Sequence, residues 1–239
     1  MNYIRPVREV GGKKLTDEQP PVRPSAPPPP GTLHPVAPSR APEKLAAWTK
    51  SLVRAIAFTE SRPARVIGIT GISRGVGTSL IAQGLAQIYS EFDRRILFVN
   101  ASTANLSETV PATVENVPDL AALSTNGNGK YYDVDLSDPR IVLPQNAEFF
   151  RYTFELALNH FHAIVVDLAN AAGPTGRPTP GFLAVGPSCN ALFLVCMTGR
   201  TTRSEVQQCL ASCRISGANV EGILLNDYRL PGSALLSET

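Results

Sequence analysis

Five short, mostly apolar segments are spaced along the chain, at positions 65–70, 96–99, 163–166, 191–197 and 220–225. A strand that is apolar at successive positions is covered on both of its faces, as in a parallel sheet that lies between two layers of helices. Alternating apolar and polar residues would instead indicate a strand with one face in solvent. We therefore predict an α/β domain built on a mostly parallel sheet.

Outside these segments the apolar residues recur at helical spacing. In residues 43–59 they fall three or four positions apart, and this spacing predicts an amphipathic helix at the start of the domain. Similar patterns after residue 79, near 148–159 and in 202–215 predict further helices. The expected fold is a doubly wound sheet with helices on both of its faces.

Residues 102–143 lack both patterns. They are rich in Ser, Thr, Asn, Gly and Pro, with Asn-Gly-Asn-Gly at positions 126–129, so we predict long loops over the ligand end of the sheet. Tyr131 and Tyr132 fall in this stretch. They are interpreted as aromatic anchors of the loop, with a pair of modified tyrosines as the alternative.

Composition separates a tail from the domain. The chain has 239 residues and 21 prolines, and many of the prolines lie before Lys44, including the run at 27–30. Too few large apolar side chains accompany them to offset the entropy of ordering, so residues 1–43 are predicted to be disordered and residues 44–239 to form the domain. The proline run is interpreted as a solvated tether, with a polyproline ligand for a partner domain as the alternative.

Charge and hydropathy exclude several classes of protein. The formal net charge is only +2, and no dense run of Lys or Arg marks a basic face, so we do not expect a dedicated nucleic-acid binder. No apolar run approaches the roughly 18 to 20 residues needed to cross a bilayer, and the N-terminus lacks the apolar region of a signal peptide. A cytoplasmic protein with no integral membrane segment is expected.

Cysteine and histidine give no strong metal signal. The four cysteines include no C-x-x-C pair and are interpreted as small buried apolar residues or bystander thiols: Cys189, Cys196, Cys209 and Cys213. His160 and His162 have no cysteine or carboxylate partner at ligand spacing, so we expect ordinary surface and strand-edge histidines.

A glycine-rich loop follows the first predicted strand. Residues 71–80 are Gly-Ile-Ser-Arg-Gly-Val-Gly-Thr-Ser-Leu, whereas a P-loop has the spacing G-x-x-x-x-G-K-[ST]. Aligned on Gly77 and Ser79, the lysine position holds Thr78 and the first glycine position holds Ile72. Arg74 is a candidate replacement for the missing cation. A dinucleotide fingerprint would need glycine at position 80, and a plain strand-to-helix turn without ligand remains an alternative.

The order of these segments resembles a known family. The glycine loop, then residues 94–100, 161–167, 191–201 and 220–226, is similar to the MinD/ParA branch of P-loop proteins. Within that branch the pattern resembles the cytoplasmic domains of bacterial tyrosine kinases (BY-kinases) of capsule and exopolysaccharide synthesis. The resemblance covers roughly residues 44–228 and implies a P-loop NTPase-like fold that binds ATP or ADP with Mg²⁺.

The resemblance also implies which residues form the site. The candidates for nucleotide binding are Arg74, Gly75, Val76, Gly77, Thr78, Ser79 and Asn226, the last of them near the base. Ser79 and the Walker-B-like Asp167 are the candidates for Mg²⁺, and Asp167 is the candidate catalytic residue.

The departures from the family pattern are informative. Active members end their second strand in a D-x-D pair, whereas this chain has Asn100 and Ser102 there. Of the C-terminal tyrosine cluster only Tyr228 is present, and the ring-forming E-x-x-R-x-x-R pattern is reduced to Lys50 and Arg54. Phosphoryl transfer depends on positioning and charge stabilisation, and single groups of this kind are worth about 3 to 4 kcal/mol of barrier. Efficient kinase or ATPase activity is therefore not expected.

These observations lead to one main hypothesis and two alternatives. The main hypothesis is a non-catalytic or weakly catalytic kinase-like component of exopolysaccharide synthesis or export, with holdfast synthesis as one specific form. It would lie at the inner membrane by docking on a chain-length regulator, with residues 44–59 as a candidate contact, and homo-oligomers are left open. One alternative is an ATPase or autokinase that uses Arg74, Ser79 and Asp167. The other is a positioning ATPase of the MinD/ParA type, although Ser73 replaces its signature cation.

Overall fold

A computed structural model describes residues 52–61, 65–113, 117–126, 128–138 and 141–227. The predicted disordered tail, the first part of the predicted helix at 43–59, and Tyr228 lie outside these residues. Residues 52–60 are helical. The elements that follow are, in order, β1 (Val66–Gly71), α2 (Thr78–Ser90), β2 (Ile96–Ala101), β3 (Leu106–Ser107), α3 (Leu120–Leu123), β4 (Thr125–Asn126), β5 (Tyr131–Asp135), β6 (Leu143–Pro144), α4 (Ala147–Ala157), β7 (Ala163–Leu168), α5 (Pro180–Val185), a 3₁₀ turn (Gly186–Ser188), β8 (Ala191–Met197), α6 (Arg203–Ser216) and β9 (Val220–Asn226).

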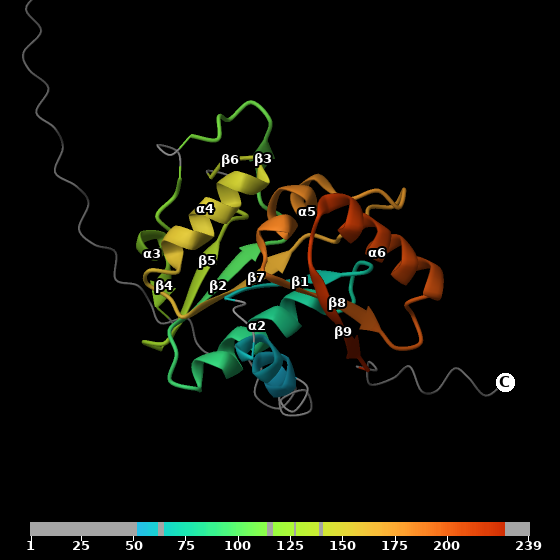
Figure 1. Cartoon of the computed structure of the whole chain (residues 1–239), viewed down its shortest axis with the longest axis horizontal. Helices are drawn as coiled ribbons and strands as arrows, with labels where there is room; N and C mark the ends of the chain where they lie inside the picture. The colour runs from blue at the N-terminus through green and yellow to red at the C-terminus, as the bar shows by residue number, and fades with distance from the viewer. Residues whose placement is uncertain (1–51, 62–64, 114–116, 127, 139–140, 228–239) are drawn as a thin grey trace, which may run out of the picture. The chain divides into compact units, whose positions relative to one another are not determined.

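A seven-stranded sheet forms the centre of the domain, in the order β4-β5-β2-β7-β1-β8-β9 (Figure 1). All neighbouring strands are parallel except the short β4, which runs antiparallel to β5. The five strands predicted from apolar runs are β1, β2, β7, β8 and β9, and all five are confirmed. Because β1 lies between β7 and β8, the glycine loop that follows it leaves the sheet at the shared carboxyl edge.

The prediction of long loops over residues 102–143 was wrong for part of that stretch. Tyr131–Asp135 forms β5 and pairs in parallel with β2, from Ile96↔Tyr131 to Asn100↔Asp135. The strand was not apparent from the sequence because polar residues interrupt its apolar ones and because it lies next to the edge of the sheet. Tyr131 is buried and stacks on Phe98 with ring centroids 6.4 Å apart, and the Tyr132 hydroxyl donates to the carbonyl of Gly129. The two tyrosines therefore anchor a strand and not a loop.

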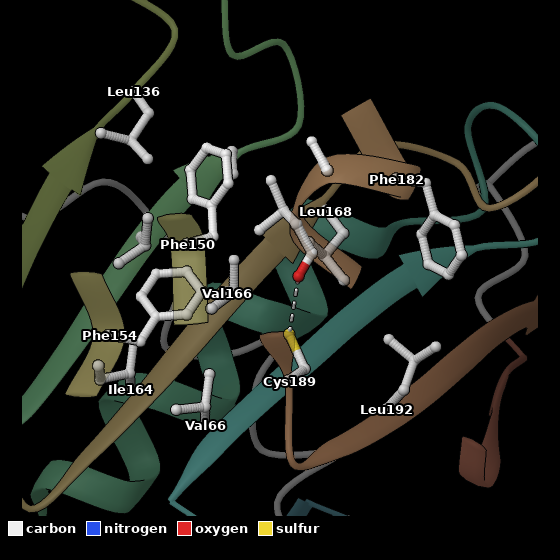
Figure 2. Packing of buried hydrophobic residues seen from close by; sticks show 14 of the residues in the cluster. Val66, Leu136, Phe150, Phe154, Ile164, Val166, Leu168, Phe182, Cys189 and Leu192 are labelled. Carbon is white, nitrogen blue, oxygen red and sulfur yellow. Dashed lines mark hydrogen bonds between the residues drawn. The ribbon is translucent and has the colours of Figure 1, made fainter. Parts of the chain in front are cut away.

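Two hydrophobic clusters cover the two faces of the sheet. The larger one lies under α4, α5 and α6, and Figure 2 shows Phe150, Phe154 and Phe182 packed over strand residues such as Val166. The other cluster lies under α2 and the helical residues 52–60. Along β7, Ile164 and Val166 belong to the first cluster, and Ala163 and Val165 belong to the second. This division explains why the strand is apolar at successive positions.

All four cysteines are free and buried, as predicted. Cys189 packs against Gly68 of β1, where an added Cβ would come within 2.8 Å of its sulfur. Burial raises the pKa of the Cys189 thiol to about 12, so this thiol stays protonated at neutral pH. Cys196, Cys209 and Cys213 contribute to the same cluster as Cys189. Their burial identifies them as core residues.

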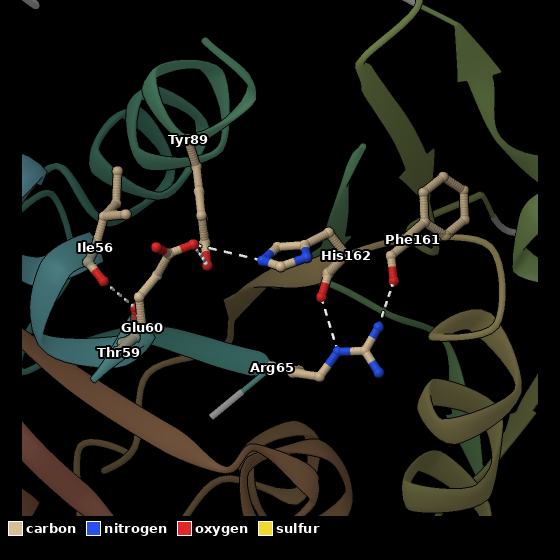
Figure 3. Close-up of polar contacts among 7 residues, drawn as sticks. All are labelled: Ile56, Thr59, Glu60, Arg65, Tyr89, Phe161 and His162. Atoms are coloured by element: carbon tan, nitrogen blue, oxygen red, sulfur yellow. Dashed lines mark hydrogen bonds and ion pairs between the residues drawn. The ribbon is translucent and has the colours of Figure 1, made fainter. Parts of the chain in front are cut away.

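A polar junction holds the first helix to the domain (Figure 3). One carboxylate oxygen of Glu60, at the end of the helical residues 52–60, accepts a hydrogen bond from the Tyr89 hydroxyl at 3.1 Å and lies 3.4 Å from His162 Nε2. Arg65 donates to the carbonyls of Phe161 and His162, at 2.8 Å each. The junction thereby connects the first helix, α2 and the start of β7, with His162 at the strand edge where the sequence predicted it.

Candidate functional site

The glycine loop connects the end of β1 at Gly71 to the start of α2 at Thr78. Gly75 and Gly77 have φ angles of +76° and +87°, which side chains rarely adopt. Gly77 is the residue before the helix, and no side chain caps it. The amides of the first turn of α2 therefore keep no intrahelical partner and favour an anion at this end of the helix.

The close approach inside the loop occurs at Gly71. An added Cβ there would lie 2.5 Å from Thr78 Oγ1 and 2.9 Å from Asn170 Oδ1. Ile72, which the P-loop alignment placed at the first glycine position, is buried, and its amide donates to the Val195 carbonyl at 3.1 Å. The position at which this close approach requires glycine is therefore 71, one residue earlier than the motif spacing indicates. Thr78 sits beside it with a short hydroxyl where a P-loop carries a long cation.

Asp167 lies at the carboxyl end of β7, between Ile69 of β1 and Asn100 of β2. It is only 1% exposed, and the Ser79 hydroxyl hydrogen-bonds to its carboxyl group. Among the residues that the structure describes, its Oδ1 has no hydrogen-bond partner. Burial, partly offset by the Ser79 bond, raises the pKa of Asp167 to about 6. A buried oxygen without a partner favours a ligand that supplies a cation or a donor.

A cleft of about 1030 Å³ opens between the loop and the opposite wall. Its walls are formed by residues 72–75 and 77–80, by Ser102 and Thr103, by residues 167–170 and 172–174, by Thr179, and by Glu205 and Gln208 of α6. Among the described residues that line it, Arg74 is the single cationic one, and it is exposed at the loop. Glu205 accepts a hydrogen bond from the Thr202 amide at 2.7 Å in the capping box of α6. Among the described residues, the lining of the cleft is thus poor in positive charge.

The two D-x-D positions hold neutral groups that bind each other. The Ser102 hydroxyl donates to Asn100 Oδ1 at 2.7 Å, and Asn100 Nδ2 donates to Asp135 Oδ1 at 3.0 Å. Asp135 also accepts from the amide and hydroxyl of Ser137. The Asp135 carboxylate of β5 is therefore engaged in this hydrogen-bond network.

The donors at the cleft fit a magnesium ion in part. Mg²⁺ takes oxygen ligands, and it commonly combines one or two protein groups with phosphate oxygens and water. Ser79 and Asp167 supply a hydroxyl and a carboxylate with one unpartnered oxygen. In the described part of the chain, no group of three or more His, Cys, Asp or Glu side chains is arranged to hold a metal. A bound phosphate would have to complete the coordination.

The structure brings most of the predicted site residues together. Six of them line the cleft, namely Arg74, Gly75, Gly77, Thr78, Ser79 and Asp167. Val76 and Asn226 do not line it. Val76 is a buried residue of the loop, and its carbonyl accepts a hydrogen bond from Asn226 Nδ2 at 2.8 Å. Asn226 thus contacts the loop at Val76, and its place near a nucleotide base stays a prediction.

The far wall of the cleft was not predicted. Asn170, Thr179, Glu205 and Gln208 come from the segment after β7 and from α6, and no motif marks them. The Thr179 hydroxyl donates to the Asn170 carbonyl at 2.7 Å and so closes the turn that carries this wall. The only available signal was general, since ligands in α/β sheets bind beyond the carboxyl ends of the strands.

No protein-family model matches the sequence, and no curated protein sequence is significantly similar to it. Solved structures do match. The kinase domain of the Escherichia coli tyrosine kinase ETK has a TM-score of 0.57 at 21% identity, over 80% of this chain and 78% of that one. The VpsO kinase domain matches with a TM-score of 0.54 at 14% identity, over 80% of this chain and 100% of that one. The septum site-determining protein MinD of Pyrococcus horikoshii, complexed with Mg-ADP, matches with a TM-score of 0.52 at 14% identity, over 71% of this chain and 75% of that one.

These similarities establish the fold. The chain has the fold shared by bacterial tyrosine kinase domains and by MinD, as its segment order predicted. Within the described residues no helix is both long enough and apolar enough to span a bilayer.

Proposed function

We propose that this protein binds the phosphates of ATP or ADP in the cleft without efficient turnover, as a kinase-like component of exopolysaccharide synthesis or export. One observation supports the proposal. The loop glycines, the start of α2 and the Ser79–Asp167 pair lie together at the cleft, whereas Thr78, Asn100 and Ser102 stand at the positions of the cation and both carboxylates.

Binding rests on the loop and on Asp167. The amides of the first turn of α2 attract an anion, and Arg74 at the rim adds one positive charge. Mg²⁺, when bound, would neutralise phosphate charge. Ser79 and Asp167 are the residues of this chain that would hold it, because their oxygens meet at the cleft and Oδ1 has no partner among the described residues.

Slow or absent turnover follows from the replaced groups. Thr78 cannot reach a transferring phosphoryl group with a charge, and neither Asn100 nor Ser102 can act as an anionic ligand or base. Each lost electrostatic group is worth about 3 to 4 kcal/mol of barrier, so the combined loss removes most of the expected acceleration. The signal that such a protein gives is occupancy of the cleft.

The biological role is proposed from the resemblance to kinase domains. The partner would be an inner-membrane chain-length regulator, and the protein would lie peripherally at the cytoplasmic side of that membrane. The first helix is the proposed contact because it follows the tail and is fixed to the domain by the Glu60 junction. Holdfast synthesis is one specific form of this role.

The test is isothermal titration of the purified protein with ATP and ADP, each with and without Mg²⁺. We expect micromolar binding that Gly77→Ala abolishes, because an alanine at φ +87° is strained and its Cβ would lie 2.6 Å from Asn226 Nδ2. Gly199→Ala is the matched control, since Gly199 also has a positive φ but has no atom within 4 Å of an added Cβ. No binding up to millimolar nucleotide would overturn the proposal.

A further inference from the structure

Asn226 connects the last strand of the sheet to the glycine loop. It is 2% exposed and ends β9, where it pairs with Met197 of β8. Its carbonyl accepts a hydrogen bond from the Thr198 amide at 2.9 Å, so its main chain is fixed by β8. Its side-chain amide donates to the Val76 carbonyl at 2.8 Å, across 150 residues of sequence.

The contact with Val76 is made at the point where the loop turns into α2. Val76 is buried, and the next residue, Gly77, has the left-handed conformation that directs the chain into the helix. An added Cβ at Gly77 would lie 2.6 Å from Asn226 Nδ2. The loop residue without a side chain and the asparagine therefore fit each other, and each limits what the other position can hold.

From this contact we infer that Asn226 is a positioning residue, which holds the glycine loop in its anion-binding shape from behind without touching the ligand. Ile72 and Val76 pack into the core on either side of the loop tip, but Gly75 between them has no atom within 4 Å of an added Cβ. A hydrogen bond from a strand fixed in the sheet lowers the number of conformations that the loop can adopt. Pre-ordering the loop in this way raises its affinity for an anion.

A direct ligand contact is a poorer explanation of the same residue. Asn226 is buried and is not among the residues that line the cleft. The amide hydrogen that it donates to Val76 is committed to the loop and is not offered to a ligand.

Amide hydrogen exchange in the ligand-free protein tests the inference independently of nucleotide binding. The variants are Asn226→Ala, which removes the donor without adding charge, and Asn226→Asp, which keeps the size of the side chain. We expect exchange in residues 72–80 to accelerate at least tenfold in both variants, with the rest of β1 and α2 unchanged. Asn219→Ala is the matched control, because Asn219 Nδ2 also donates to a backbone carbonyl, that of Asn190, at the other end of β9.

The second measurement is the dissociation constant for ADP. Unlike the hydrogen-exchange measurement, it rests on the proposed function. Asn226→Ala is expected to weaken ADP binding about tenfold, the equivalent of one net hydrogen bond, and Asn219→Ala is expected to leave it unchanged. Unchanged loop exchange in both Asn226 variants would overturn the inference, even where wild-type protein binds ADP. Faster loop exchange without wild-type ADP binding would uphold the positioning role and overturn the proposed function instead.

Discussion

Asp167 is held in an environment that opposes its charge. Burial raises its pKa to about 6, while the Ser79 hydroxyl acts in the opposite direction. In the unfolded chain an aspartate loses its proton near pH 4. Between these two values the folded protein binds more protons than the unfolded chain, so this group makes stability fall as the pH rises from about 4 to about 6.

Asp167→Asn should remove that loss of stability. Relative to wild type, we expect the variant to gain little free energy of unfolding at pH 4 and up to about 3 kcal/mol above pH 6. Urea denaturation at several pH values in the presence of a chelator measures the difference. Asp227→Asn, at an exposed aspartate, is the control. A constant difference between Asp167→Asn and wild type across the pH range would contradict the assigned cause.

At the scale of elements, the first helix is fixed through a small number of polar contacts. The Tyr89 hydroxyl donates to Glu60, and burial together with the Glu60 charge raises the pKa of Tyr89 above its ordinary value. The hydroxyl therefore stays protonated and remains a donor across the physiological range. The Glu60–His162 contact at 3.4 Å lies partly in solvent and adds less.

Tyr89→Phe should loosen the first helix. We expect a loss of about 1 kcal/mol in the free energy of unfolding, because one partly buried hydrogen bond disappears while the aromatic ring remains. Tyr152→Phe, on the exposed side of α4, should have almost no effect. Equal effects of the two variants in urea denaturation would show that the junction does not stabilise the helix.

Which elements the sequence could predict depends on how they are buried. β1, β2, β7, β8 and β9 were predicted because mostly apolar segments mark them. β5 was missed since its sequence, Tyr-Tyr-Asp-Val-Asp, contains two aspartates and no apolar run, and pairing with β2 decides its structure. α5 was missed because it has only six residues, although Thr179 caps it and proline begins it.

The residues of the site could likewise be predicted only where a local pattern marks them. The glycine loop and Asp167 could be predicted because each follows an apolar strand, and parallel strands end at one edge. Asn170 and Gln208 reach the cleft only because the chain after β7 packs over α6, and the Ser212 hydroxyl donates to Gly176 there at 3.2 Å. Such contacts between distant segments leave no local pattern in the sequence.

At the scale of the whole molecule, the replaced groups form a connected set. Asn100 donates to Asp135, so an aspartate at position 100 would bring two carboxylates together. The amide at position 100 is compatible with the carboxylate at position 135 because it donates a hydrogen bond to it. Placing carboxylates at positions 100 and 102 therefore calls for a change in β5 as well.

We predict that Thr78→Lys, Asn100→Asp and Ser102→Asp, combined with Asp135→Asn, produce measurable phosphate release from Mg-ATP. The same three changes without Asp135→Asn should lower the melting temperature by several degrees, because like charges then face each other across β2 and β5. Equal stability of the two combined variants would contradict the predicted repulsion between carboxylates on β2 and β5.

The central claim is that the cleft holds a nucleotide and does not turn it over. It is tested most directly by dialysing the wild-type protein to equilibrium against labelled Mg-ATP, at concentrations well above the expected micromolar dissociation constant, and identifying the bound nucleotide. We expect close to one nucleotide per protein, present as intact ATP. Recovery of ADP with released phosphate, lost in Asp167→Ala, or recovery of no nucleotide at all would contradict it.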